Sequence, residues 1–115
     1  MSPGRPGAGD RVRIHLLRHA HAGDALEWTG DDALRPLTKK GRRQSERLGA
    51  FLESHGVRPD VIVSSPLVRA QQTAEIVANT LGMTVRLDGR LGSGFGRQEL
   101  WAMLDELGAR EPMFV

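Results

Sequence analysis

The chain has no cysteine and no tyrosine among its 115 residues, and aromatic residues make up 4% of it. Without cysteine it cannot form a disulfide bond, a thiolate metal site or a cysteine nucleophile. The scarcity of aromatic side chains argues against a stacking platform for single-stranded nucleic acid. No apolar run approaches the roughly 20 residues of a membrane-spanning helix, and the first ten residues lack the apolar stretch of a secretion signal. These absences predict a cytoplasmic protein with no membrane partner.

An excess of charge of one sign is also missing. The 16 Lys and Arg residues are nearly balanced by 14 Asp and Glu residues, which leaves a net charge of +2. A nucleic-acid-binding protein usually carries a larger or more segregated positive excess. One basic cluster does occur, formed by Lys39, Lys40, Arg42 and Arg43. We interpret it as the solvated face of a helix and expect no nucleic-acid partner; a nucleic-acid-binding module is the alternative hypothesis.

The length of the chain suits one small domain, and its 39% of hydrophobic residues can form a core. Residues 1–10 are rich in glycine and proline and are predicted to form a flexible tail. The remaining residues, 11–115, are predicted to form the domain.

Strand-like and helix-like segments alternate along this domain. Apolar runs predict strands at 12–17, 61–63, 83–87 and 112–115. Helical periodicity predicts helices over 39–54, 66–81 and 97–107, with apolar faces that include Phe51 and Trp101. Caps are expected from Thr38, from Ser65 followed by Pro66, and from the glycines at 56, 82 and 108. The order predicts a three-layer α/β fold, with a mainly parallel sheet and helices on both faces.

Two of the predicted strands are followed by residues that suit phosphate chemistry. Arg18 and His19 follow the first strand, and Arg69 lies in the first turns of the helix after the second strand. A cation there opposes the helix dipole unless an anion is bound, and a helix N-terminus with an arginine is a suitable phosphate site. If the two strands are neighbours, these side chains converge on one crevice. His19 could then attack phosphorus while the arginines stabilise the transferring group.

The other histidines have less specific interpretations. His15 lies within a predicted strand and is expected to face a helix or solvent, and His55 is expected to end a helix. His21 could line the crevice or have a structural role. A metal site formed by His19 and His21 is not expected, because no third ligand has suitable spacing.

Three segments resemble a known family. Residues 16–20 (LLRHA) resemble the RHG signature of the histidine phosphatase superfamily, whose fold is phosphoglycerate mutase-like. Residues 35–38 (RPLT), followed by Gly41 and Arg42, resemble an element of its SixA-like phosphohistidine phosphatase branch. Residues 64–74 (SSPLVRAQQTA) are similar to the segment that supplies the second arginine of the family.

The resemblance implies that His19 is the nucleophile and forms a phosphohistidine intermediate. It implies that Arg18 and Arg69 bind the phosphoryl group, with no metal and no organic cofactor. The expected activity is hydrolysis of phosphohistidine or of a small phosphomonoester. The expected partner is therefore a phosphorylated protein side chain or a small phosphorylated molecule.

The sequence departs from the family pattern in three places. Ala20 replaces the usual glycine, and residues 88–91 lack the glutamate that donates a proton in many relatives, which leaves Asp88 as a candidate. The family also carries a second catalytic histidine after a fourth strand, whereas this chain ends at Val115. We therefore expect a domain that lacks its C-terminal strand or strands. The alternative function is a catalytically impaired phosphate-binding module or fragment.

Overall fold

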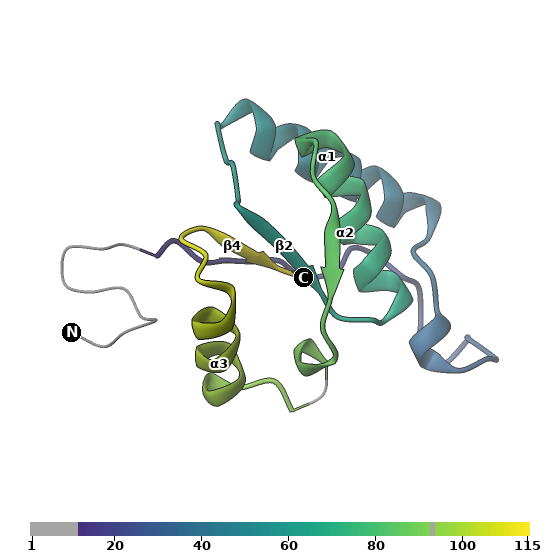
Figure 1. Cartoon of the computed structure of the whole chain (residues 1–115). Helices are drawn as coiled ribbons and strands as arrows, with labels where there is room; N and C mark the ends of the chain where they lie inside the picture. The colour runs from purple at the N-terminus through teal and green to yellow at the C-terminus, as the bar shows by residue number, and fades with distance from the viewer. Residues whose placement is uncertain (1–11, 93) are drawn as a thin grey trace.

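The computed structural model describes residues 12–92 and 94–115 (Figure 1). The flexible tail predicted for 1–10 lies outside the described residues. The strands are β1 (His15–Leu16), β2 (Val61–Ser64), β3 (Val85–Leu87) and β4 (Pro112–Phe114). The α-helices are α1 (Lys39–Ser54), α2 (Val68–Leu81) and α3 (Arg97–Leu107), and short 3-10 helices are η1 (Asp32–Leu34) and η2 (Gly89–Leu91).

The four strands form one sheet in the order β1-β4-β2-β3, and each pairing is parallel. Helices α1 and α2 pack side by side on one face of the sheet, and α3 covers the other face (Figure 1). The chain crosses the sheet in one direction as it passes from β1 through α1 to β2, and then through α2 to β3. It returns through α3 to β4, which lies between β1 and β2. The predicted three-layer α/β fold with a mainly parallel sheet is confirmed.

Two apolar clusters lie on the two faces of the sheet. On the side of α1 and α2, Ile62 and Met113 pack with Leu52 and Val77. On the side of α3, the neighbouring strand residues Val63 and Phe114 pack with Met103 and Leu104. Successive side chains of a strand point to opposite faces, so β2 and β4 each contribute to both clusters. Strand β2 is therefore buried on both faces.

Two strand predictions need correction. The first strand, expected over 12–17, has ladder pairing only at His15 and Leu16, because its described neighbour β4 is itself three residues long. Extended backbone contacts continue on both sides of it: Arg13 N–H donates to the Arg110 carbonyl and Leu17 N–H to the Phe114 carbonyl, both at 2.8 Å. The third strand begins at 85 rather than 83. The first and second strands are not neighbours, since β4 lies between them.

Most of the predicted helix caps are found. The Thr38 hydroxyl accepts the N–H of Gly41 at 3.1 Å and starts α1. Glycines with positive φ end or follow the three helices, at 56, 82 and 108. The cap at Ser65 is wrong, because Ser65 still bonds along the sheet through its N–H to the Val115 carbonyl at 2.9 Å. Its hydroxyl accepts the N–H of Leu67 in a turn, and α2 begins at Val68 without a side-chain cap.

Two aromatic residues expected on buried helix faces lie at the surface. Phe51 is 55% exposed and Trp101 is 41% exposed, whereas the adjacent faces are buried through Leu52 and Met103. The Phe51 ring packs on the ring of His55, with centroids 4.0 Å apart. Lys39, Lys40, Arg42 and Arg43 are exposed on α1, so the basic cluster lies on a solvent-facing side of this helix. Within the described residues, no helix is both long enough and apolar enough to cross a membrane.

Candidate active site

The candidate site lies where the chain leaves β1 and where α2 begins. The backbone N–H of Ala20 donates to the hydroxyl of Thr73 at 3.0 Å. That hydroxyl is fully buried and donates in turn to the carbonyl of Arg69 at 2.8 Å. The residues after β1 are therefore tied to α2, although β4 separates β1 from β2 in the sheet.

Helix α1 holds the same segment from another side. The His21 carbonyl accepts the N–H of Thr38 at 3.0 Å, and the His21 N–H donates to the side chain of Gln44 at 3.0 Å. A Cβ atom at Gly41 would overlap the His21 carbonyl. Glycine at this position thus lets the N-terminus of α1 approach the backbone two residues after His19.

The ring of His19 has a defined tautomer in its neutral form. His19 is exposed, and its Nδ1 lies 2.9 Å from the carbonyl oxygen of Ala20. A carbonyl oxygen can only accept, so Nδ1 carries the hydrogen and donates it. The lone pair of the neutral ring is then on Nε2. This geometry leaves Nε2 available as a nucleophile on the solvent side of the segment.

Arg69 is a buried cation with an unfilled donor. Its side chain is 10% exposed. Nη1 donates to the backbone carbonyl of Asp32 at 2.8 Å, and Nη2 donates to the carboxylate of the same residue at 3.1 Å. Nε is buried and has no hydrogen-bond partner within the part of the chain that the structure describes. An unsatisfied buried donor is unfavourable, so Nε is a place where an anion would be stabilised.

Asp32 is a site residue that no sequence motif indicates. Its carboxylate accepts from Nε of Arg35 at 3.1 Å as well as from Arg69. The hydrogen bond from Arg35, together with the charge of Arg69, holds the pKa of the Asp32 carboxyl below its ordinary value. The spacing of Asp32 and Arg35 could have indicated their pair, but no sequence pattern indicates a contact with Arg69, which is 37 residues away.

The three predicted site residues lie in segments that follow the carboxyl ends of β1 and β2. Arg18 and His19 are exposed in the segment after β1, and Arg69 is buried in the first turn of α2. Thr73 links the two segments, and within residues 12–92 and 94–115 no hydrogen bond joins these three side chains directly.

The remaining histidines have structural contacts. Nδ1 of His21 lies 2.8 Å from the hydroxyl of Thr38, so His21 supports the start of α1. His15 pairs through Nε2 with the carboxylate of Glu111 at 3.0 Å. His55 caps the C-terminus of α1, as expected. Within the described residues, no group of three or more His, Cys, Asp or Glu side chains is placed to hold a metal ion.

Asp88 is not suited to donate a proton. Its carboxylate accepts from Nη2 of Arg90, and it also accepts the backbone N–H of that residue at 2.9 Å. These hydrogen bonds from Arg90 hold the pKa of the Asp88 carboxyl below its ordinary value. A carboxyl with a lowered pKa stays ionised at neutral pH and acts as an acceptor. Protonation of a leaving group therefore has no assigned side chain.

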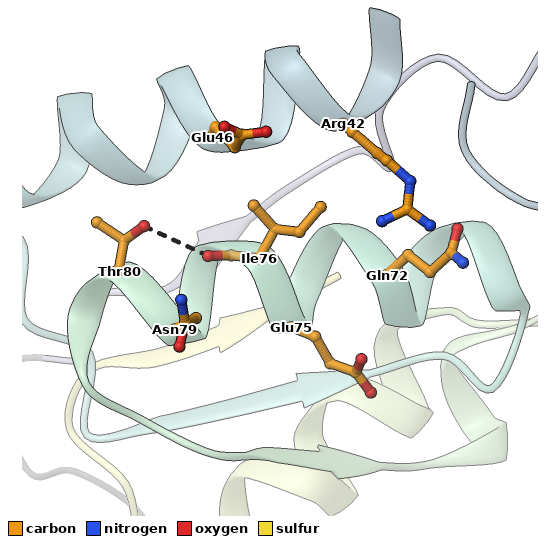
Figure 2. Close-up of a pocket in the computed structure, with 7 residues that line it drawn as sticks. All are labelled: Arg42, Glu46, Gln72, Glu75, Ile76, Asn79 and Thr80. Carbon is orange, nitrogen blue, oxygen red and sulfur yellow. Dashed lines mark hydrogen bonds between the residues drawn. The ribbon is translucent and has the colours of Figure 1, made fainter. Parts of the chain in front are cut away.

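A groove of about 620 Å³ lies between α1 and α2 (Figure 2). Figure 2 shows polar side chains from both helices around it, with Ile76 between them. It is lined by Arg42, Glu46, Gln72, Glu75, Ile76, Asn79 and Thr80. None of the predicted site residues lines this groove, so it is separate from the candidate active site.

Comparisons with known proteins show the family of the chain and solved structures with a similar fold. The profile described as Histidine phosphatase superfamily (branch 1) matches residues 14–107. The solved SixA structure from Nakamurella multipartitia is 33% identical, has a TM-score of 0.74, and matches 94% of this chain and 59% of that one. The SixA structure from Agrobacterium tumefaciens is 24% identical, has a TM-score of 0.80, and matches 90% of this chain and 68% of that one.

One curated relative is the mitochondrial serine/threonine-protein phosphatase Pgam5 of Drosophila ananassae. The two sequences are 39% identical over 64 residues, which cover 56% of this chain and 21% of that protein. The chain spans between 21% and 40% of the length of the curated relatives it matches. The structural matches confirm the phosphoglycerate mutase-like fold. Because the family profile covers most of the chain, the chain belongs to the histidine phosphatase superfamily.

Proposed function

We propose that the protein is a phosphatase that transfers a phosphoryl group first to His19 and then to water. The observation that carries this proposal is the hydrogen bonding of two side chains, His19 and Arg69. Nδ1 of His19 donates to the Ala20 carbonyl, which leaves Nε2 with its lone pair. Nε of Arg69 is a buried donor without a partner among the described residues. A nucleophile and an unfilled anion donor on two linked segments suit phosphoryl transfer.

In the first step, Nε2 of His19 attacks phosphorus, the N–P bond forms, and the bond from phosphorus to the leaving group breaks. In the second step, water attacks the phosphohistidine, the N–P bond breaks, and inorganic phosphate leaves. Arg69, with Arg18, stabilises the negative charge on the phosphoryl oxygens in both steps. Since His19 is exposed, water reaches the intermediate directly. Water supplies the proton that the leaving group takes up in the first step, and the water that attacks in the second step loses a proton to the released phosphate.

The proposed substrate is a phosphorylated protein side chain, with phosphohistidine as the first choice and a small phosphomonoester as the second. The exposure of His19 favours a substrate that is part of a protein surface, because such a substrate cannot enter a deep pocket. The likeness to the SixA structures supports the same substrate class.

The test is turnover of a phosphohistidine peptide and of a phosphoserine peptide by the unchanged protein and by two variants. His19→Ala should abolish turnover and the acid-labile phosphate on the protein. His55→Ala is the matched control, because His55 is exposed at the end of α1 and should leave turnover unchanged. Equal turnover by His19→Ala and the unchanged protein would contradict the proposal. Orthovanadate binding without turnover would support the phosphate-binding alternative.

A further inference from the structure

We propose that Asp32 is a positioning residue for Arg69: it holds both terminal nitrogens of the guanidinium and leaves the Nε edge for the phosphoryl group. This inference rests on the proposed function, because it specifies how the anion donor of that site is oriented. Asp32 itself does not touch the substrate in this proposal.

The two contacts come from different parts of Asp32. Nη1 of Arg69 donates to its backbone carbonyl at 2.8 Å, and Nη2 donates to its carboxylate at 3.1 Å. Two acceptors from one residue hold the planar guanidinium in one orientation, as one acceptor cannot. These two hydrogen bonds use the terminal nitrogens of the guanidinium, and Nε has no partner among the described residues.

The backbone of Asp32 is itself held in place. Asp32 is the first residue of η1, whose N-terminus is capped by Asp31 through the N–H of Ala33 at 3.0 Å. The Asp32 carbonyl also accepts the N–H of Arg35 at 3.1 Å. The carbonyl that faces Arg69 therefore belongs to a short helix with its own cap, so its direction does not depend on Arg69 alone.

Arg35 fixes the carboxylate from the other side. Its Nε donates to the second carboxylate oxygen of Asp32 at 3.1 Å. Its Nη1 donates to the carbonyls of Ala22 and Gly23 at 2.8 and 3.1 Å. The Arg35 side chain is 11% exposed. The path from Ala22 through Arg35 and Asp32 to Arg69 thus connects the segment after His19 to α2 a second time, independently of Thr73.

For removal of the Asp32 carboxylate, an effect of charge alone and an effect on the orientation of Arg69 predict opposite changes in anion affinity. A carboxylate beside an anion site repels the anion, so its removal should tighten binding if only charge matters. If Asp32 orients Arg69, its removal should weaken binding despite the lost repulsion. In Asp32→Asn the single amide oxygen can face Arg35 or Arg69, and the amide nitrogen then faces the other guanidinium donor. This variant keeps the size of the side chain and separates the two effects.

The first experiment measures the affinity of the full chain for inorganic phosphate by calorimetry. We expect Asp32→Asn to weaken binding about tenfold, the effect of losing one charge-assisted hydrogen bond, and Asp32→Glu to restore part of it. Asp24→Asn is the matched control, because Asp24 lies in the same loop and accepts the N–H of Leu26 instead of an arginine donor. Unchanged or tighter binding by Asp32→Asn would overturn the inference.

The second experiment follows the Nε–H signal of Arg69 by NMR, assigned with Arg69→Lys. In the unchanged protein this signal should be sharp and should shift when phosphate is added. In Asp32→Asn it should broaden, while the backbone signals of α2 stay in place. A signal that phosphate does not shift would contradict the proposed phosphoryl site. A signal that shifts with phosphate and is equally sharp in Asp32→Asn would contradict the role of Asp32 alone.

Discussion

The backbone N–H of Ala20 donates to the hydroxyl of Thr73, which lies 53 residues further along the chain, at 3.0 Å. The hydroxyl also donates to the carbonyl of Arg69, so its hydrogen and a lone pair are both in use. This contact sets the distance between the segment that carries His19 and the helix that carries Arg69. A side chain with only one of these capacities cannot replace it.

Thr73→Val should lower both stability and phosphate affinity. Valine has the same shape as threonine but leaves the N–H of Ala20 without its partner in a partly buried position. Loss of such a partner costs about 1–3 kcal/mol. Urea denaturation should show a loss in this range, and calorimetry should show weaker phosphate binding than in the unchanged protein.

Thr80→Val is the control for the loss of a helical threonine. Its hydroxyl bonds to the Ile76 carbonyl within α2 at 3.4 Å and is also partly buried (Figure 2). We expect its effect on the free energy of unfolding to stay below about 0.5 kcal/mol, with phosphate affinity unchanged. If both valine variants bind phosphate as the unchanged protein does, Thr73 has no part in arranging the site.

Gly41→Ala should destabilise the protein although alanine favours helices. In a helix without tertiary contacts, this change would stabilise by about 1 kcal/mol. Here the added Cβ would overlap the carbonyl of His21, which is backbone and cannot rotate away. We expect a net loss of about 2 kcal/mol or more, measured by urea denaturation. Gly89→Ala is the control, because a Cβ at Gly89 meets nothing within 4 Å; an equal loss there would refute the steric explanation.

Local sequence signals predicted the elements whose ends are determined locally. The third helix was expected over 97–107 and is found as Arg97–Leu107, because a glycine with positive φ follows it. Thr38 was expected to start the first helix and does so with its own hydroxyl. These features depend on residues within one turn of each other, which is the range over which capping acts.

Features that depend on distant residues could not be predicted. The position of β4 between β1 and β2 follows from the return of α3 across the other face of the sheet. The contacts of Asp32 with Arg69 and of Ala20 with Thr73 join residues 37 and 53 positions apart. The motifs identified Arg18, His19 and Arg69 as candidates, but no local pattern indicates which residues orient them.

Leu52→Ala should lower the free energy of unfolding more than Phe51→Ala, although phenylalanine is the larger residue. Leu52 is 7% exposed and belongs to the core under α1 and α2, whereas Phe51 is 55% exposed. Leu52→Ala should cost about 2–5 kcal/mol through the cavity it leaves. Phe51→Ala loses its contact with the His55 ring and should cost less than about 1 kcal/mol. Similar losses in urea denaturation for the two variants would place Phe51 in the core instead.

The free energy of unfolding should lose a contribution from Arg90 as the pH falls. Hydrogen bonds from Arg90 lower the pKa of the carboxyl groups of Asp88 and Glu106 in the folded protein. A group with a lowered folded pKa stabilises the fold above its unfolded pKa, and this contribution disappears as the pH falls through the folded pKa. Both ordinary values, 3.8 for Asp and 4.5 for Glu, lie in the acidic range. The contribution of Arg90 should therefore be complete at neutral pH.

Arg90→Gln measures this contribution through the difference in unfolding free energy from the unchanged protein. The difference should be largest near about pH 7 and should shrink toward about pH 3, where both carboxyl groups gain protons. It should also shrink in high salt, because Glu106 is exposed. Arg86→Gln is the control, since Arg86 is an exposed arginine on the neighbouring strand β3. A difference for Arg90→Gln that is constant across this pH range would show that packing, rather than the two ion pairs, accounts for its effect.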